Sequence, residues 1–370
     1  MKTFWAFVLF FVSVGFLFLA VYFDLNQKLL PPVSSGQKQE QASSTTTEKQ
    51  NQVSTSTPTV KKSATTKKAL SVITQVPSEK SQTVPQPTID LAALNTQTRA
   101  ALVNILCQTQ AGGPLSPISG SGVLVSSDGV ILTVAHVAEF FLLRNFYGQN
   151  SVQCVIRVGS PAYPTYNAEL VYISPSWVAQ NKSVLLESTP TGTGEHDYAF
   201  LRITGRIDGS QLPTDFPFLS INTSEIKNVG DFALLAAYPA GFLGSQSILQ
   251  NLFQSSAETT IQKIYTFSSA TADVISLPGT IISQSGSSGG AVVSGKGELI
   301  GLISTDTAAD QTSGRDLRAI TTGYIARDLK AESGSTIADI LASSAAYAKN
   351  FNATIAPKLA EILTDAILQK

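Results

Sequence analysis

The sequence is poor in the residues that bind nucleic acid or metal ions. Its 25 basic and 26 acidic residues leave a formal net charge of −1, so nothing indicates a nucleic-acid partner. It contains only two cysteines and two histidines, and they lie in separate sequence contexts. Zinc sites usually need about four ligands. The sequence therefore predicts no metal site, and no cofactor is expected.

The longest uncharged run stands near the beginning of the sequence. Residues Phe4 to Phe23 are twenty residues without a charged side chain, about the length of a helix that crosses a bilayer. The bulky residues before Ala20 do not match a signal-peptide cleavage site, so we favour a retained single-pass anchor at 1–24 over a cleaved signal peptide. Lys2 places the N-terminus in the cytoplasm by the positive-inside rule. The rest of the chain is then expected outside the cytoplasm, in the periplasm or at the cell surface.

Residues 25–90 are dominated by Ser, Thr, Gln, Lys and Pro, with almost no aromatic or large apolar side chains. Such a segment cannot bury a core, and we expect a disordered linker. About 60 residues of flexible coil have a root-mean-square reach of about 40 Å. The linker would therefore hold the following domain away from the membrane.

The two cysteines, Cys107 and Cys154, are an even number in a chain that we expect to enter an oxidising compartment. We predict a disulfide between them, and the alternative is two buried free thiols. A bridge that closes a loop of this length would stabilise the fold by about 4 kcal/mol in the chain-entropy treatment.

Between residues 91 and 330 the sequence changes to short apolar runs separated by Gly, Pro, Asn and Ser. Many short β-rich runs with turn signals indicate a barrel or a sandwich. Residues 331–370 show helical spacing of apolar side chains, with Ile355, Leu359 and Leu363 among them. We expect these helices to pack against the β domain, and the alternative is a partner-binding helix.

Only His136 and His196 are candidates for a base that acts near neutral pH. His136 follows an expected hairpin, whose turn is at 127–129, and a buried strand that ends in the sequence TVAHV. Asp197 stands directly before the apolar run YAFLRI, where a carboxylate could be held away from water. The histidine alone could be a core residue, and an aspartate before a strand is common. Taken together with a suitable serine, they suggest a catalytic triad.

That serine is Ser288, in the sequence GSSGGAVVS, where Gly286, Gly289 and Gly290 flank it. A serine hydroxyl needs a base to take its proton, and the imidazole needs a buried carboxylate to fix its tautomer. The oxyanion formed by attack needs backbone N–H donors that approach to about 2.7–3.1 Å, which glycine permits. We therefore predict an oxyanion hole formed by the N–H groups of Gly286 and Ser288.

These three segments resemble the trypsin/chymotrypsin-fold serine proteases, in particular the bacterial HtrA-like branch. The residues follow the family's chain order of His, Asp and Ser, and the resemblance extends from about Arg99 to Leu329. It implies an all-β fold of two six-stranded antiparallel β-barrels, joined at about 205–215. The first barrel would carry His136 and Asp197, and the second Ser288. Too few residues follow Leu329 for a PDZ domain, so none is expected.

The resemblance also implies where the substrate side chain binds. It places the walls of the specificity pocket at residues 282–284 and 304–306, with Ile282 at the base. An apolar base favours small or medium apolar side chains, whereas Asp306 at the rim would favour a basic one. The predicted pocket residues are Ile282, Ser283, Gln284, Ser304, Thr305 and Asp306.

The sequence thus predicts a membrane-anchored serine endopeptidase that acts on proteins or peptides outside the cytoplasm. The alternative is a catalytically inactive protease-fold module that binds or senses a partner at the membrane. The sequence implies no particular oligomeric state.

Overall fold

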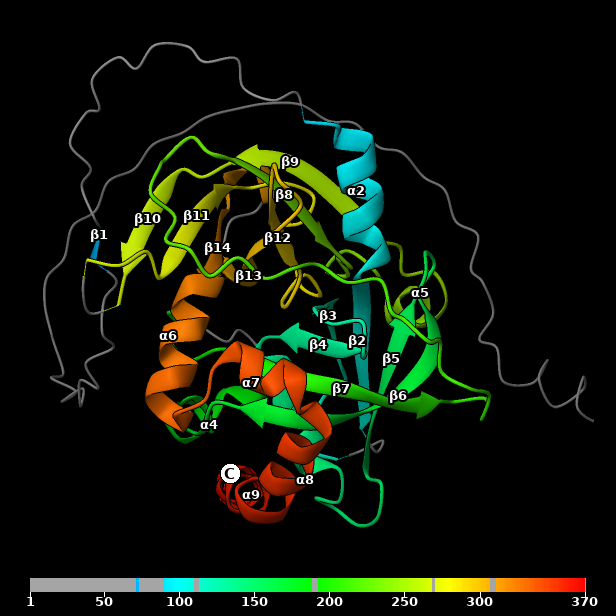
Figure 1. Cartoon of the computed structure of the whole chain (residues 1–370). Helices are drawn as coiled ribbons and strands as arrows, with labels where there is room; N and C mark the ends of the chain where they lie inside the picture. Colours follow the sequence, from blue (N-terminus) through cyan, green and yellow to red (C-terminus); the bar gives the residue numbers. More distant parts are fainter. Residues whose placement is uncertain are drawn as a thin grey trace, which may run out of the picture. The chain divides into compact units, whose positions relative to one another are not determined.

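The computed structural model describes the chain over the following residues: 71–72, 89–109, 113–187, 192–267, 270–306 and 311–369 (Figure 1). The predicted anchor lies outside these ranges, as does the predicted linker except for residues 71–72 and 89–90. Among the helices in these ranges, none has both the length and the apolar character needed to cross a membrane.

Six antiparallel strands close into a barrel in the order β2-β3-β4-β7-β6-β5 (Figure 1). Its core consists of fully buried side chains such as Ile105, Leu132, Ile156 and Phe200. The strands are β2 (Leu102–Thr109), β3 (Ile118–Leu124), β4 (Val130–Thr133), β5 (Val152–Val158), β6 (Tyr163–Ile173) and β7 (Ala199–Arg206).

The hairpin between β3 and β4 turns at the residues that the sequence predicted. Gly129 has a φ of 80°, a left-handed conformation that glycine adopts without steric cost, and its N–H donates to the carbonyl of Ser126. The Val125 N–H donates to the Val130 carbonyl across the turn. The turn therefore sets the register of β4, the strand that leads to His136.

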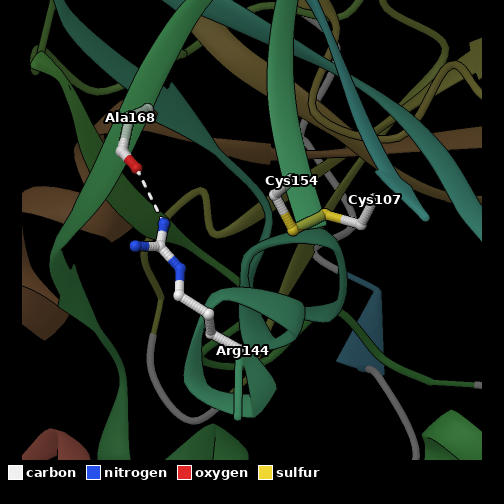
Figure 2. The surroundings of a disulfide bond; sticks show 4 residues. All are labelled: Cys107, Arg144, Cys154 and Ala168. Carbon is white, nitrogen blue, oxygen red and sulfur yellow. Dashed lines mark hydrogen bonds between the residues drawn. A yellow bond between two sulfur atoms is a disulfide. The ribbon is translucent and has the colours of Figure 1, made fainter. Parts of the chain in front are cut away.

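A disulfide joins Cys107 of β2 to Cys154 of β5, the pair predicted from the sequence. The two residues lie opposite each other in the antiparallel ladder between these strands. Figure 2 shows the bridge on the barrel wall near Arg144, whose side chain donates to the carbonyl of Ala168 on β6 at 3.5 Å. The disulfide thus connects two strands that are neighbours in the barrel but distant in the sequence.

The second β unit is a sheet of eight strands in the order β1-β10-β11-β14-β13-β12-β8-β9. Its own core includes Leu235, Ile275, Val292 and Ile303. The strands are β1 (Ser71–Val72), β8 (Phe232–Ala237), β9 (Ser255–Thr260), β10 (Lys263–Thr266), β11 (Val274–Pro278), β12 (Ala291–Ser294), β13 (Leu299–Asp306) and β14 (Asp316–Thr321).

The prediction of a second six-stranded barrel is wrong, because this second unit is an open sheet of eight strands, a half-barrel. Only Ile261 and Gln262 separate β9 from β10, although these strands lie near opposite ends of the sheet order. The Ile261 N–H donates to the Asp231 carbonyl before β8, whereas the Gln262 N–H donates to the Ser276 carbonyl on β11. The chain therefore changes its pairing partner at this bend. β9 and β10 follow each other in the sequence but form no ladder with each other, so the sheet stays open.

Two further differences from the sequence expectations concern residues near the ends of the β domain. Ser71 and Val72, inside the predicted linker, form β1 and pair with Thr266 and Tyr265 of β10. The segment before β2 is a helix, α2 (Leu91–Ala100), whose N-terminal N–H at Ala93 is capped by the side chain of Asp90. Neither element was predicted from the sequence.

The remaining helices cover the ends of the β units (Figure 1). The apolar stripe of the last helix is buried, and Asn352 on the helix before it donates to the Leu170 carbonyl of β6 at 2.8 Å. The predicted packing against the β domain is thus confirmed. The helices are α4 (Pro175–Asn181), α5 (Ser245–Gln250), α6 (Thr322–Ser333), α7 (Ile337–Ala342), α8 (Ser344–Thr354) and α9 (Ala356–Leu368), with short 3₁₀ helices η1 (Glu139–Leu143), η2 (Val184–Leu186) and η3 (Thr312–Gly314).

Candidate active site

His136 lies in the short helix α3 (Ala135–Ala138), which begins directly after β4. Before the helix, Thr133 donates through its hydroxyl to the Ser121 carbonyl of β3 at 2.7 Å. The side chains around the histidine are buried, but its own side chain keeps 22% of its surface exposed. The buried strand therefore fixes the position of the imidazole while solvent can still reach it.

Asp197 holds His136 by two hydrogen bonds. Its Oδ2 lies 2.9 Å from His136 Nδ1, and its Oδ1 accepts from the His136 backbone N–H at 3.0 Å. The hydroxyl of Ser304 on β13 donates to the same Oδ2 at 2.7 Å. With the carboxylate ionised, the shared proton sits on Nδ1 of the neutral ring and Nε2 is left as a proton acceptor.

The buried pair shifts the pKa values of both its members in opposite directions. Burial alone would lower the pKa of His136, but the charge and hydrogen bond of Asp197 outweigh burial and raise it. Burial alone would raise the pKa of Asp197, but His136, the Ser304 hydroxyl and the backbone N–H lower it. The carboxylate is therefore kept ionised beside a histidine that is a stronger base than usual.

The loop that carries Ser288 is built around glycines. Gly286 and Gly289 have φ values of 90° and 84°, in the left-handed region. A Cβ at Gly289 would lie 2.1 Å from the Ser121 carbonyl oxygen, and one at Gly286 would lie 2.7 Å from the Tyr238 carbonyl oxygen. Both positions thus need glycine for their backbone conformation and for the close approach of another main-chain segment.

Ser121 on β3 connects this loop to the first barrel. Its N–H donates to the Ser288 carbonyl at 2.8 Å, and its hydroxyl donates to the Gly286 carbonyl at 2.8 Å. The hydroxyl also accepts from the Tyr238 N–H at 2.9 Å. Ser121 therefore fixes the Ser288 loop against the same barrel that holds His136, a role that its sequence context did not reveal.

The predicted oxyanion-hole donors, the N–H groups of Gly286 and Ser288, lie in the same loop. In the described part of the chain, neither the Gly286 N–H nor the Ser288 N–H donates a hydrogen bond, whereas those of Ser287, Gly289 and Gly290 do. Two N–H groups without an internal acceptor are what an oxyanion needs. Among the described side chains, no hydrogen bond joins Ser288 to His136, which is common before a substrate orders the site.

The predicted specificity-pocket residues have several different surroundings. Ile282 is fully buried in the core of the second sheet, and the Ser283 carbonyl accepts from Arg315 at 2.6 Å. Gln284 donates to the Ile281 carbonyl at 2.6 Å, and Ser304 binds Asp197 as described above. The side chains of Thr305 and Asp306, at the end of β13, lie outside what the structure describes.

Glu139 is a buried acid near Asp197, and it was not predicted as a site residue from the sequence. It follows His136 by three residues and is 1% exposed. Burial raises the pKa of its carboxyl well above the usual range, and the charge of Asp197 raises it further. In the described part of the chain its Oε2 has no hydrogen-bond partner. A glutamate near a helix end usually lies on the surface, so no local sequence pattern indicates that Glu139 is buried.

A closed barrel and a half-barrel with a buried His–Asp pair near a glycine-constrained serine loop define the chymotrypsin-like fold of peptidases. Residues 120–302 match the family model of the trypsin-like peptidase domain, and this part of the chain belongs to that family. The family implies that the substrates are proteins or peptides. A comparison with curated proteins finds no match.

Proposed function

We propose that the chain is a serine endopeptidase that works through His136, Asp197 and Ser288. The observation that carries this proposal is the buried His136–Asp197 pair, which is connected through Ser121 and Thr133 to the loop that carries Ser288. A catalytically inactive protease-fold module that only binds a partner would not need an ionised carboxylate buried behind the histidine. Burying a charge costs free energy, which such a module would have no reason to spend.

The proposed reaction has two halves, acylation of Ser288 and hydrolysis of the acyl-enzyme, and the same residues act in both. His136 Nε2 takes the proton of the Ser288 hydroxyl, and Oγ attacks the scissile carbonyl carbon. The N–H groups of Gly286 and Ser288 stabilise the oxyanion, and Asp197 stabilises the imidazolium. The proton then passes to the leaving amine as the peptide bond breaks. Water attacks the acyl-enzyme with His136 again as the base, and this releases the acid and restores Ser288.

A fluorophosphonate probe tests the proposal, because only an activated serine displaces its fluoride. We expect labelling of Ser288 in the full chain, together with hydrolysis of a peptide library. Ser288→Ala and His136→Ala should each lose both by several orders of magnitude, because the residues act as one unit. Ser285→Ala is the matched control, since Ser285 is an exposed serine in the same loop. Labelling that persists in Ser288→Ala would show that the nucleophile is misassigned.

We also propose that the peptidase domain is held outside the cytoplasm by the predicted anchor at residues 1–24. The Cys107–Cys154 disulfide supports this location, because such bridges persist in oxidising compartments. Protease added to cells with a permeabilised outer envelope and an intact cytoplasmic membrane should release the peptidase domain, as detected with an antibody against α9. A domain that is cut only after the cytoplasmic membrane is lysed would lie in the cytoplasm and contradict the proposal.

A further inference from the structure

A second cluster of titratable groups lies next to the active site and takes no part in the proposed reaction. His196 precedes Asp197 and has a φ of 62°, and its Nδ1 lies 2.8 Å from Asp328 Oδ2 and 3.8 Å from Glu332 Oε1. The last two residues are four positions apart on α6 and so lie on the same face of that helix. Their ligand atoms all fall within 4.8 Å of one another.

The two carboxylates of this cluster carry more negative charge than the nearby positive charge can balance. The side chains of Asp328 and Glu332 are only 10% and 12% exposed, and His196 provides at most one positive charge. In the described ranges, no Lys or Arg forms an ion pair with either carboxylate. Buried charges are normally paired or bound to a metal ion. One divalent cation beside a neutral histidine would balance both carboxylates.

Polar atoms without partners point to the same place. Glu332 Oε1 is buried and, among the described residues, has no hydrogen-bond partner, although Tyr172 donates to Oε2 at 2.9 Å. The hydroxyl of Tyr198 is fully buried and likewise has no partner in that part of the chain. The Tyr198 ring stacks on that of Tyr172, the donor to Glu332, with the ring centroids 6.0 Å apart.

We propose that His196, Asp328 and Glu332 form a binding site for one divalent transition-metal ion of the Zn²⁺ type. Zinc binds histidine nitrogen and carboxylate oxygen at about 2.0–2.2 Å, so two ligand atoms in a tetrahedral site lie about 3.4 Å apart. The observed separations of 2.8 and 3.8 Å lie on either side of this value. The ion replaces the proton between His196 and Asp328, and Tyr172 orients the Glu332 ligand as a hydrogen-bond donor.

The site connects two parts of the molecule. α6 begins directly after β14 of the second sheet, whereas Tyr172 lies on β6 of the first barrel, and His196 stands in the turn that leads to Asp197 (Figure 1). A bound ion would hold α6 and this turn together. The site does not depend on the proposed peptidase reaction, because it contains none of its three catalytic residues.

Isothermal titration of the full chain, purified in detergent and stripped with chelator, tests the site with Zn²⁺ alone. We expect one ion per chain and a higher melting temperature in its presence, with much weaker binding of Ca²⁺, which prefers oxygen ligands. Glu332→Gln keeps an acceptor for Tyr172 but loses the charge, and should weaken Zn²⁺ binding by at least about tenfold. Glu361→Gln, the same change on the exposed face of α9, should bind as the unaltered chain does.

The two histidines of the chain provide the decisive comparison. His196→Asn should lose the ion and still fold, since asparagine tolerates a positive φ, whereas His136→Ala should bind Zn²⁺ normally. Binding that disappears in His136→Ala and persists in His196→Asn would place the ion at the catalytic pair and overturn the proposal. An unaltered chain that binds no Zn²⁺ overturns it regardless of how the variants fold.

Discussion

Replacing Ser121 by alanine should disturb the connection between the two β units at a single point. The change removes the hydroxyl that donates to the Gly286 carbonyl and accepts from the Tyr238 N–H. Both hydrogen bonds are buried, so water cannot take over the role of the lost hydroxyl. The backbone bond from the Ser121 N–H to the Ser288 carbonyl remains, and the strand itself should form as before.

The expected loss of stability follows from the two orphaned groups. A buried donor or acceptor left without a partner costs about 1–3 kcal/mol, so two such groups cost about 2–6 kcal/mol. This is a large part of the total stability of an ordinary domain, which is about 5–15 kcal/mol. The Ser288 loop should also lose its fixed position. As a result, kcat/KM should fall by more than the unfolded fraction of the chain at the assay temperature explains.

Urea unfolding followed by circular dichroism measures the first effect, and peptide hydrolysis measures the second. Ser119→Ala on the same strand is the matched control. The Ser119 hydroxyl accepts one hydrogen bond from Asn104 Nδ2, which also donates to the Gly120 carbonyl. Its loss should cost about 0.5–1.5 kcal/mol and leave kcat/KM unchanged. If the two variants unfold at the same urea concentration, the reasoning about Ser121 is wrong.

Two further predictions concern groups in the first barrel. The raised pKa of Glu139 means that the folded chain keeps a proton that the unfolded chain releases, so stability should fall as pH rises above the ordinary glutamate pKa. Glu139→Gln cannot ionise and should remove this part of the pH dependence in thermal unfolding; an unchanged profile would contradict it. Replacing Cys107 and Cys154 together by serine should lower the unfolding free energy by about 4 kcal/mol, for a separation of 47 residues. Equal stability of the reduced and oxidised native chain would show that the bridge contributes nothing.

Local patterns predicted much of the first barrel. The glycine turn before β4, the apolar strands and the pairing of Cys107 with Cys154 are all readable from short segments. The contact between His136 and Asp197 agrees with the three sequence segments taken together. The apolar run that contains β14 ends its strand at Thr321, whose hydroxyl accepts from the Tyr324 N–H and begins α6. A threonine N-cap inside an apolar run is easily taken for a strand residue.

Other features depend on contacts between distant segments and leave no local pattern. The sequence predicted no metal site because its two cysteines and two histidines lie in separate contexts. The proximity of Asp328 and Glu332 to His196 arises only when α6 folds back. The burial of Glu139 and the bend at Ile261 likewise depend on the packed barrels. Single-sequence patterns do not contain this information.

Gly289 restricts how the sequence can vary during evolution. The atom that a Cβ would meet first is the carbonyl oxygen of Ser121, at 2.1 Å, and this oxygen is present whatever amino acid occupies that position. A second mutation therefore cannot make room by shortening a neighbouring side chain. Changes at Thr133 would relieve only the other close contact, at 2.4 Å. In a library that saturates every position, we expect no functional replacement of Gly289 and no second-site suppressor for it.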